Sequence, residues 1–417
     1  MSHCDLLSVK ENPITLMPSV LLLVMSILLL GFFPSVGVGI FYADSNALGL
    51  FVYCIILSIY LVRFLPSLQF IPRSICVLIF VLMMYSVIQM MFLNTSSVKS
   101  LLSLPIFLFI ATSACVWAAG FNKIWDYNLS KVITIVFIIM TVIAILNIII
   151  AINFLNYTHY RSVVPFIEAS HFALYFGPIS MMMALIQNNL TKRFMVAGVV
   201  LSLALLIPSM TLLVYTMLIF ILLLKFRLMY FLVFGFLILL LSYVVLTTPY
   251  FLDRILISNS NQNLTYLVYL QGVYDAYNSL VVSNYLGLGF QLLGTQPRSE
   301  QSYIIERLAG IQLNREDGGF LAAKILAEFG ILGAIFILYY LKISLEAFGF
   351  LKKQILIINN RQNLKHQLVA VIIFAFSVEL FVRGAGYFSS GVFLFIFALF
   401  YYKKYMRSSF SNSVCQV

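Results

Sequence analysis

The chain has 417 residues, of which 62% are hydrophobic and only 9% are charged, and its mean hydropathy is +1.04. A water-soluble globule of this size does not carry so little polar surface, so the composition excludes a soluble protein and indicates an integral membrane protein. The formal net charge of +11 does not indicate a nucleic-acid partner, because the basic residues stand in short caps between apolar runs.

Apolar runs of about 20 residues, the length that an α-helix needs to cross a bilayer, recur along the chain. Barrel strands are shorter and alternate, so the pattern predicts an all-α polytopic protein. The first run is longer than a signal-peptide core and lacks a small-residue cleavage site, so we expect it to stay as a span. The twelve predicted spans are Ile14–Phe33, Ala47–Leu65, Ser74–Phe92, Leu101–Ala119, Val132–Leu155, His171–Gln187, Phe194–Ile207, Met210–Leu224, Leu228–Thr248, Gly319–Leu341, Gln367–Val382 and Ala385–Tyr402.

The seventh and eighth spans lie in one apolar run that only Pro208 and Ser209 interrupt. A hairpin of two short helices and one kinked helix both fit this pattern. Charge favours the hairpin, because twelve spans with a cytoplasmic start place most basic residues on the inner side, and merging the two spans breaks that alternation from Lys225 onward. We therefore expect both termini in the cytoplasm and the long polar interval outside.

Three parts follow from this topology: residues 1–248 with nine spans, residues 249–318 as a large outer loop, and residues 319–417 with three spans and a cytoplasmic tail. Apolar residues in the loop recur at helical spacing, which predicts an amphipathic helix on the membrane or on the bundle. They are Leu264, Leu267, Leu270, Val273, Tyr274 and Tyr277. Gly287 and Gly289 then predict a turn whose backbone approaches another group closely.

The basic residues outside are mostly arginines, whereas the inner caps mix lysine and arginine. The planar guanidinium holds phosphate oxygens in a bidentate manner and keeps its charge, so an outer arginine cluster suits a pyrophosphate or an acidic sugar. The alternative is that each arginine anchors a helix at the headgroups or solvates the loop. The candidates are Arg161, Arg254, Arg298, Arg307 and Arg315.

Glu168 and His171 stand where the chain re-enters the membrane, with Ser170 placed to cap the helix. A carboxylate three residues before an imidazole can orient donors toward a ligand held outside. The alternative is an ordinary interfacial cap with a satisfied histidine.

Asp317 precedes two glycines at the start of an apolar helix that itself contains Lys324 and Glu328. The carboxylate of Asp317 suits a general base, although the helix dipole alone also favours an acid there. Charged groups at membrane depth cost several kcal/mol unless they pair or face a wet cavity. Lys324 with Glu328, and Glu379 with Arg383, are each four residues apart, so pairing within each helix and a shared polar cavity are both consistent with the pattern.

Several cofactor signatures are missing from the sequence. It has no Walker loop, no dinucleotide-binding glycine pattern, no HExxH and no outer DxD motif, so we expect no cofactor and no metal site. None of the five cysteines lies in the long loop, and no pair has metal-ligand spacing.

Three features together resemble an O-antigen polymerase of the Wzy type: EASHFALYFGP at 168–178, the long outer loop with an arginine near its start and a Gly-x-Gly-Phe turn, and DGGFLAAKILAEFGILG at 317–333. The related O-antigen ligases have a histidine ahead of this last helix where the present chain has Asp317, while Glu328, Gly330 and Gly333 fit their Glu-x-Gly-x-x-Gly pattern. The departure favours polymerase over ligase.

The resemblance implies a GT-C-like glycosyltransferase in the inner membrane of a Gram-negative bacterium, with the loop in the periplasm. It would join oligosaccharide repeat units carried on undecaprenyl pyrophosphate, alongside a flippase and a chain-length regulator. Asp317, Glu168 and His171 would then form the catalytic set, with the loop arginines binding pyrophosphate and Tyr274 contacting sugar. The alternatives are a lipid-linked oligosaccharide flippase, another transporter, or a ligase; the sugars, the linkage and its stereochemistry stay open.

Overall fold

The computed structural model describes residues 13–41, 46–62, 80–81, 83–89, 91, 98–121, 126–154, 163–224, 235, 264–356 and 364–406. Within these ranges the protein is helical, and the one extended pairing is a single bridge between Val163 and Phe166. The helices are α1 (Pro13–Phe41), α2 (Ala47–Val62), α4 (Val98–Phe121), α5 (Asp126–Phe154), α6 (Ala169–Ile186), α7 (Leu190–Leu206), α8 (Met210–Leu223), α11 (Leu264–Val282), α12 (Glu300–Ala309), α13 (Leu321–Leu356), α14 (Leu364–Phe381), α15 (Ser390–Tyr401) and the π-helix η3 (Tyr402–Met406).

Six of the described helices are long and apolar enough to cross a membrane, which confirms the expected all-α membrane protein. The six segments are Val20–Val38, Lys99–Phe121, Asn128–Ile150, Ala169–Ile186, Leu321–Ile355 and Leu364–Phe381. Two shorter helices, Ala47–Ile59 and Met210–Leu223, are also apolar. The predicted span Leu228–Thr248 and part of the predicted span Ser74–Phe92 lie outside the described residues.

The run from Phe194 to Leu224 forms two helices, as the charge pattern predicts. α7 ends at Leu206, and the hydroxyl of Ser209 then accepts a hydrogen bond from the backbone N–H of Leu212 to start α8. The two helices pack against each other and both pack against α6. A single kinked helix is therefore excluded for this segment.

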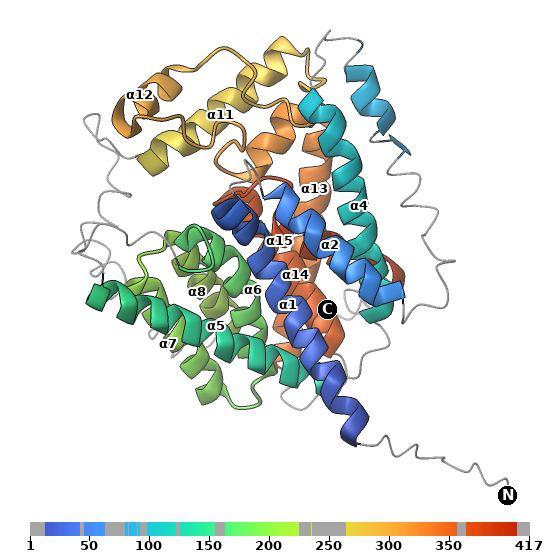
Figure 1. The fold of residues 1–417 in the computed structure, drawn as a ribbon, viewed down its shortest axis with the longest axis vertical. Coiled ribbons are helices and arrows are strands. Elements are labelled where there is room, and N and C mark those ends of the chain that lie inside the picture. Colours follow the sequence, from blue (N-terminus) through green and yellow to red (C-terminus); the bar gives the residue numbers. More distant parts are fainter. Residues whose placement is uncertain are drawn as a thin grey trace, which may run out of the picture.

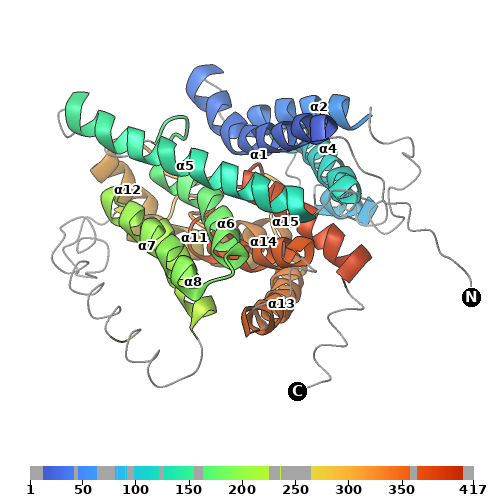
Figure 2. The same cartoon turned by 90° about the horizontal axis from the view of Figure 1, so that it is seen from below.

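Helix α14 lies at the centre of the bundle, between α13 on one side and α15 and α6 on the other (Figure 2). Its sequence is apolar on nearly every face, as is typical of a helix surrounded by protein. Small residues bring the neighbouring helices close: a Cβ on Gly177 of α6 would lie 2.3 Å from the ring of Tyr215, whose hydroxyl donates to the Ala375 carbonyl of α14 at 3.3 Å.

Helices α11 and α12 lie together at one end of the molecule, next to the first turns of α13 (Figure 1). α11 runs alongside α13, because Gly272 abuts the Gly318 carbonyl and the carbonyl of Tyr285 accepts from the Ile331 N–H at 2.9 Å. After Tyr285 the chain turns and runs back along α13 in the opposite direction as far as Gln296. There the Gln296 carbonyl accepts a hydrogen bond from Arg315. Residues 264–296 thus form a hairpin against the first part of α13.

Part of the predicted apolar face of α11 is exposed. Val273, Tyr274 and Tyr277 are 44%, 47% and 64% exposed, while Gln271, Gly272 and Asp275 are buried. Because Gly272 lets the two backbones approach closely, the polar and small face packs on α13. The apolar face is left to the surroundings of the bundle.

Candidate functional site

The first component of the site is an ion pair between Glu168 and Arg383, which come from opposite halves of the chain. Glu168 precedes α6, and Arg383 follows α14, with a nitrogen to oxygen distance of 2.9 Å. Ser170 also donates to the Glu168 carboxylate at 2.8 Å, so this serine holds the acid instead of capping the helix as the sequence predicts. The Glu168 side chain keeps 45% of its surface exposed, so it is accessible to a ligand.

Electrostatics around Glu168 favour the ionised acid. Burial alone would raise the pKa of this carboxyl, but the positive charge of Arg383, the nearby His171 and the hydrogen bond from Ser170 outweigh burial and lower the pKa below its ordinary value. A carboxylate with a lowered pKa is a weaker base, so Glu168 is less suited to accept a proton from a substrate.

The second component is an ion pair between Asp317 and Lys324 at the start of α13. The Lys324 ammonium lies 3.1 Å from the Asp317 carboxylate and donates to the Glu316 carbonyl at 2.7 Å. Lys324 is 1% exposed, whereas the Asp317 side chain is 44% exposed. The positive charge of the buried Lys324 is therefore balanced by the accessible carboxylate of Asp317.

Two glycines make this arrangement possible. Gly318 and Gly319 have φ values of 67° and 72°, in the left-handed region that favours glycine, and they fold the chain between Asp317 and α13. Asp317 is thereby turned back over the first turns of the helix, where it meets Lys324.

The two ion pairs are neighbours. The loop after α14 is tied to the start of α13 by a hydrogen bond from the Gly384 N–H to the Gly319 carbonyl at 3.1 Å. A Cβ on Gly386 of this loop would lie 2.6 Å from Asp317 Oδ1 and 3.9 Å from Lys324 Nζ. His171 lies within electrostatic range of Glu168, Arg383 and Asp317. The structure thus unites the three predicted catalytic residues at one place, which we call the charged cluster: Glu168, His171, Asp317, Lys324 and Arg383.

A buried carboxylate, Glu328, lies one turn further along α13. It is 0% exposed, and one of its oxygens accepts from the Leu293 N–H at 3.1 Å. Its other oxygen and the hydroxyl of Tyr387 have no hydrogen-bond partner among the described residues. Lys324 and Tyr387 are neighbours too, since the ammonium lies 5.2 Å from the ring centroid.

Helix α13 is broken beside Glu328. Gly330 has φ 56° and ψ −129°, which interrupts the helical hydrogen bonds, and the hairpin backbone takes their place. The N–H groups of Leu288 and Gly289 donate to the Ala327 and Glu328 carbonyls at 2.9 and 3.0 Å. This is the close backbone approach that the glycine pattern predicts for the turn at Gly287 and Gly289.

Of the two alternatives that the spacing left open, ion pairing within each helix is not observed. Lys324 is ion-paired with Asp317 and not with Glu328, and Arg383 is ion-paired with Glu168 and not with Glu379. Lys324 and Arg383 pair with Asp317 and Glu168, which lie outside the helices. These two carboxylates can remain partly hydrated at the open end of the bundle, whereas Glu328 and Glu379 are buried.

The described loop arginines do not join the charged cluster. Arg298 pairs with Glu306 at 2.6 Å, Arg307 is exposed at the end of α12, and Arg315 donates to the Gln296 carbonyl. Tyr274 is 47% exposed on the outer face of α11. Arg161 and Arg254 lie outside the described residues.

Two residues that sequence reasoning missed are Gln89 and Gln291. Gln89 donates to the Leu286 and Glu328 carbonyls, both at 2.8 Å, and Gln291 accepts from Lys324 at 3.4 Å. An amide within an apolar run is costly unless satisfied, so Gln89 carried a usable signal. Gln291 carried none, because it lies in a polar loop.

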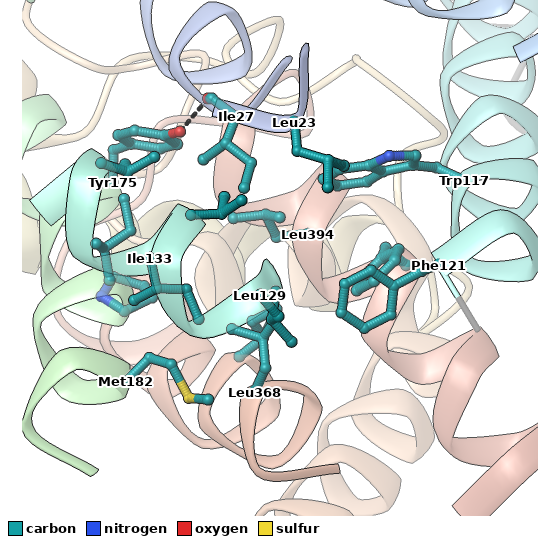
Figure 3. A pocket seen from close by; sticks show the side chains of 16 residues that line it. Leu23, Ile27, Trp117, Phe121, Leu129, Ile133, Tyr175, Met182, Leu368 and Leu394 are labelled. Carbon is teal, nitrogen blue, oxygen red and sulfur yellow. Dashed lines mark hydrogen bonds between the residues drawn. The ribbon is translucent and has the colours of Figure 1, made fainter. Parts of the chain in front are cut away.

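The described part of the chain has no transition-metal site. It contains no group of three His, Cys, Asp or Glu side chains that could hold a metal ion. A separate cavity of about 60 Å³ between α1, α4, α5, α6, α14 and α15 is lined almost wholly by apolar groups, among them Leu23, Trp117 and Phe121 (Figure 3). The hydroxyl of Tyr175 at its edge donates to the Ile27 carbonyl. This cavity offers no group for catalysis.

Comparison with protein-family models, with curated proteins and with solved structures finds no match for this chain.

Proposed function

We propose that this protein is an O-antigen polymerase of the Wzy type, a GT-C-like glycosyltransferase with twelve spans in the inner membrane of a Gram-negative bacterium. Both termini would be cytoplasmic, and the charged cluster would face the periplasm. The substrate would be an oligosaccharide repeat unit on undecaprenyl pyrophosphate, supplied by a flippase and extended under a chain-length regulator. The observation that carries the proposal is the charged cluster itself, with two accessible carboxylates and two cations at one end of an apolar bundle.

The reaction needs a base for the acceptor hydroxyl and positive charge for the departing pyrophosphate. The acceptor oxygen would form the new bond to the anomeric carbon of the donor chain as its bond to the lipid pyrophosphate breaks. The acceptor proton would pass to a carboxylate. The leaving pyrophosphate would carry away its electron pair and be stabilised by nearby cations.

Asp317 is the better candidate for the base. Glu168 has a lowered pKa and two hydrogen-bonding partners, so it serves best to hold Arg383 in place. Asp317 is accessible, and its ion-pair partner, Lys324, is buried. Lys324 and Arg383 would supply the positive charge, together with Arg161 and Arg254 if these lie nearby. His171 would orient Glu168 from behind.

The test is the surface glycan profile of a host that lacks its own polymerase. Asp317→Asn keeps the shape of the side chain but removes the base, so we expect about a 10²- to 10⁴-fold loss of polymerisation and glycans with a single repeat. Glu316→Gln is the matched control, since this neighbour pairs with Lys99 at the exposed surface and should leave long chains intact. Long chains from the Asp317→Asn protein, present in the membrane at normal level, would refute the assignment.

A lipid-linked oligosaccharide flippase is the second candidate, and the break in α13 at Gly330 favours it. Transporters often place broken helices and buried charges at their substrate sites. Here, however, the hairpin backbone and Gln89 occupy the break. The same glycan profile distinguishes the two, because loss of a flippase removes every surface repeat, whereas loss of a polymerase leaves one repeat on the lipid core.

A further inference from the structure

A second cavity, which is polar, adjoins the charged cluster at His171. It has a volume of about 30 Å³ and lies between the end of α1, the start of α2, α6, α14 and the start of α15. Its polar lining comes from Ser35, Asn46, His171, Tyr175, Glu379, Ser389 and Ser390. Nothing in the proposed polymerase reaction uses it.

Two oxygen atoms that line this cavity lack a partner. Oε1 of Glu379 and Oδ1 of Asn46 are both inaccessible to solvent and accept no hydrogen bond from the described residues. An ionised carboxylate and an amide oxygen are both acceptors, so they cannot satisfy one another. Whatever occupies the cavity must supply positive charge or donors to both oxygens.

Glu379 also lacks a counter-ion. The residue is 2% exposed, and the ion pairs among the described residues leave it out, because Arg383 is engaged with Glu168. Its Oε2 lies against Gly391 at the start of α15, where a Cβ would be only 1.7 Å away. The positive N-terminal end of the α15 dipole stabilises negative charge on Oε2. Oε1 accepts no hydrogen bond from the described residues. An ionised carboxylate in an apolar bundle costs several kcal/mol unless it takes up a proton or is balanced by a cation.

We propose that the cavity between α1, α2, α6, α14 and α15 binds one sodium ion, held by Glu379 Oε1 and Asn46 Oδ1 with the neighbouring serine hydroxyls. Oxygen donors suit a hard cation. A single carboxylate balances one positive charge, which favours a monovalent ion over Ca²⁺ or Mg²⁺. A space of about 30 Å³ has room for one ion without its hydration shell.

The first experiment is thermal unfolding of the full-length protein in detergent, in sodium, potassium and choline chloride at equal ionic strength. Because an ion that binds only the folded state stabilises it by mass action, we expect sodium alone to raise Tm in a saturable way. Glu379→Gln should abolish the sodium shift, and Asn46→Ala should weaken it. Glu328→Gln, which removes another fully buried carboxylate, should retain it.

The second experiment is direct binding of radioactive sodium to the unaltered protein, which does not depend on whether the Glu379→Gln protein folds. Saturable binding that excess unlabelled sodium displaces, and that potassium does not, supports the site. Equal Tm in the three salts together with no displaceable sodium would overturn the proposal, and would mean that the cavity holds water or that Glu379 carries a proton. Both readouts are independent of polymerase activity, so either proposal can fail alone.

Discussion

At the scale of the residue, the ion-pair partners in this protein are set by tertiary contacts and not by helical spacing. The sequence identified Glu168, His171, Asp317, Lys324 and Arg383, because charged residues stand out in an apolar chain. It could not pair them, since Asp317 reaches Lys324 only through the left-handed turn at Gly318 and Gly319. Arg383 and Glu168 lie 215 positions apart in the sequence, so no local spacing could have identified them as a pair.

The lowered pKa of Glu168 predicts how stability depends on pH. A carboxyl whose pKa is lower in the folded state contributes stability above its unfolded pKa, and this contribution is lost as the pH falls through the folded value. Thermal unfolding in detergent should therefore show a steeper fall in Tm below about pH 4.5 for the unaltered protein than for Glu168→Gln. Identical pH profiles for the two proteins would show that the ion pair with Arg383 does not stabilise the fold.

At the scale of the element, the break in α13 and the hairpin of residues 264–296 depend on each other. Gly330 frees carbonyls that the hairpin N–H groups then satisfy, and its own N–H lies against the turn at Gly287. Periodicity predicted α11 correctly as a helix but could not tell which face is buried, because in a membrane protein the apolar side has no need to turn inward. The two helices α7 and α8 were predictable, since Pro208 and the charge alternation both mark their boundary.

Replacement of Gly330 by alanine should disrupt this element. Its φ of 56° with ψ of −129° is a conformation that only glycine adopts readily, and a Cβ would lie 2.0 Å from the Tyr285 carbonyl oxygen. We expect a loss of at least about 1–3 kcal/mol in unfolding free energy, and loss of polymerisation with it.

Gly349→Ala is the control for Gly330→Ala in the same helix, because no atom lies within 4 Å of a Cβ built there. It should stabilise the protein by about 0.5–1 kcal/mol. Thermal unfolding of both variants is the measurement. Equal Tm values for the Gly330→Ala and unaltered proteins would show that the break is not required.

At the scale of the whole molecule, the hairpin and α12 are grouped at one end, next to the first turns of α13, while α14 runs through the centre of the bundle (Figure 1). Composition was sufficient to predict the all-α membrane class. The site was predictable only as a set of residues, because its geometry depends on contacts among α6, the α14–α15 loop and the start of α13.

The proposed orientation makes a prediction of its own. A phosphatase that is active only in the periplasm, inserted at Gly310 in the open turn after α12, should be active, because we place this end of the molecule outside. The same reporter fused at the C-terminus should be inactive, while a fluorescent protein fused there should fluoresce. The reverse pattern would place the charged cluster in the cytoplasm and remove the basis for a periplasmic polymerase.

The most direct measurement is reconstitution of the purified protein into liposomes with a single purified substrate, an undecaprenyl-pyrophosphate-linked repeat unit, followed by separation of the products by size. The account predicts a ladder of lengthening glycans from the unaltered protein and from Glu316→Gln, and unextended repeat units from Asp317→Asn at equal protein incorporation. A ladder of equal length from Asp317→Asn, or no ladder from the unaltered protein with its matching repeat unit, would contradict it.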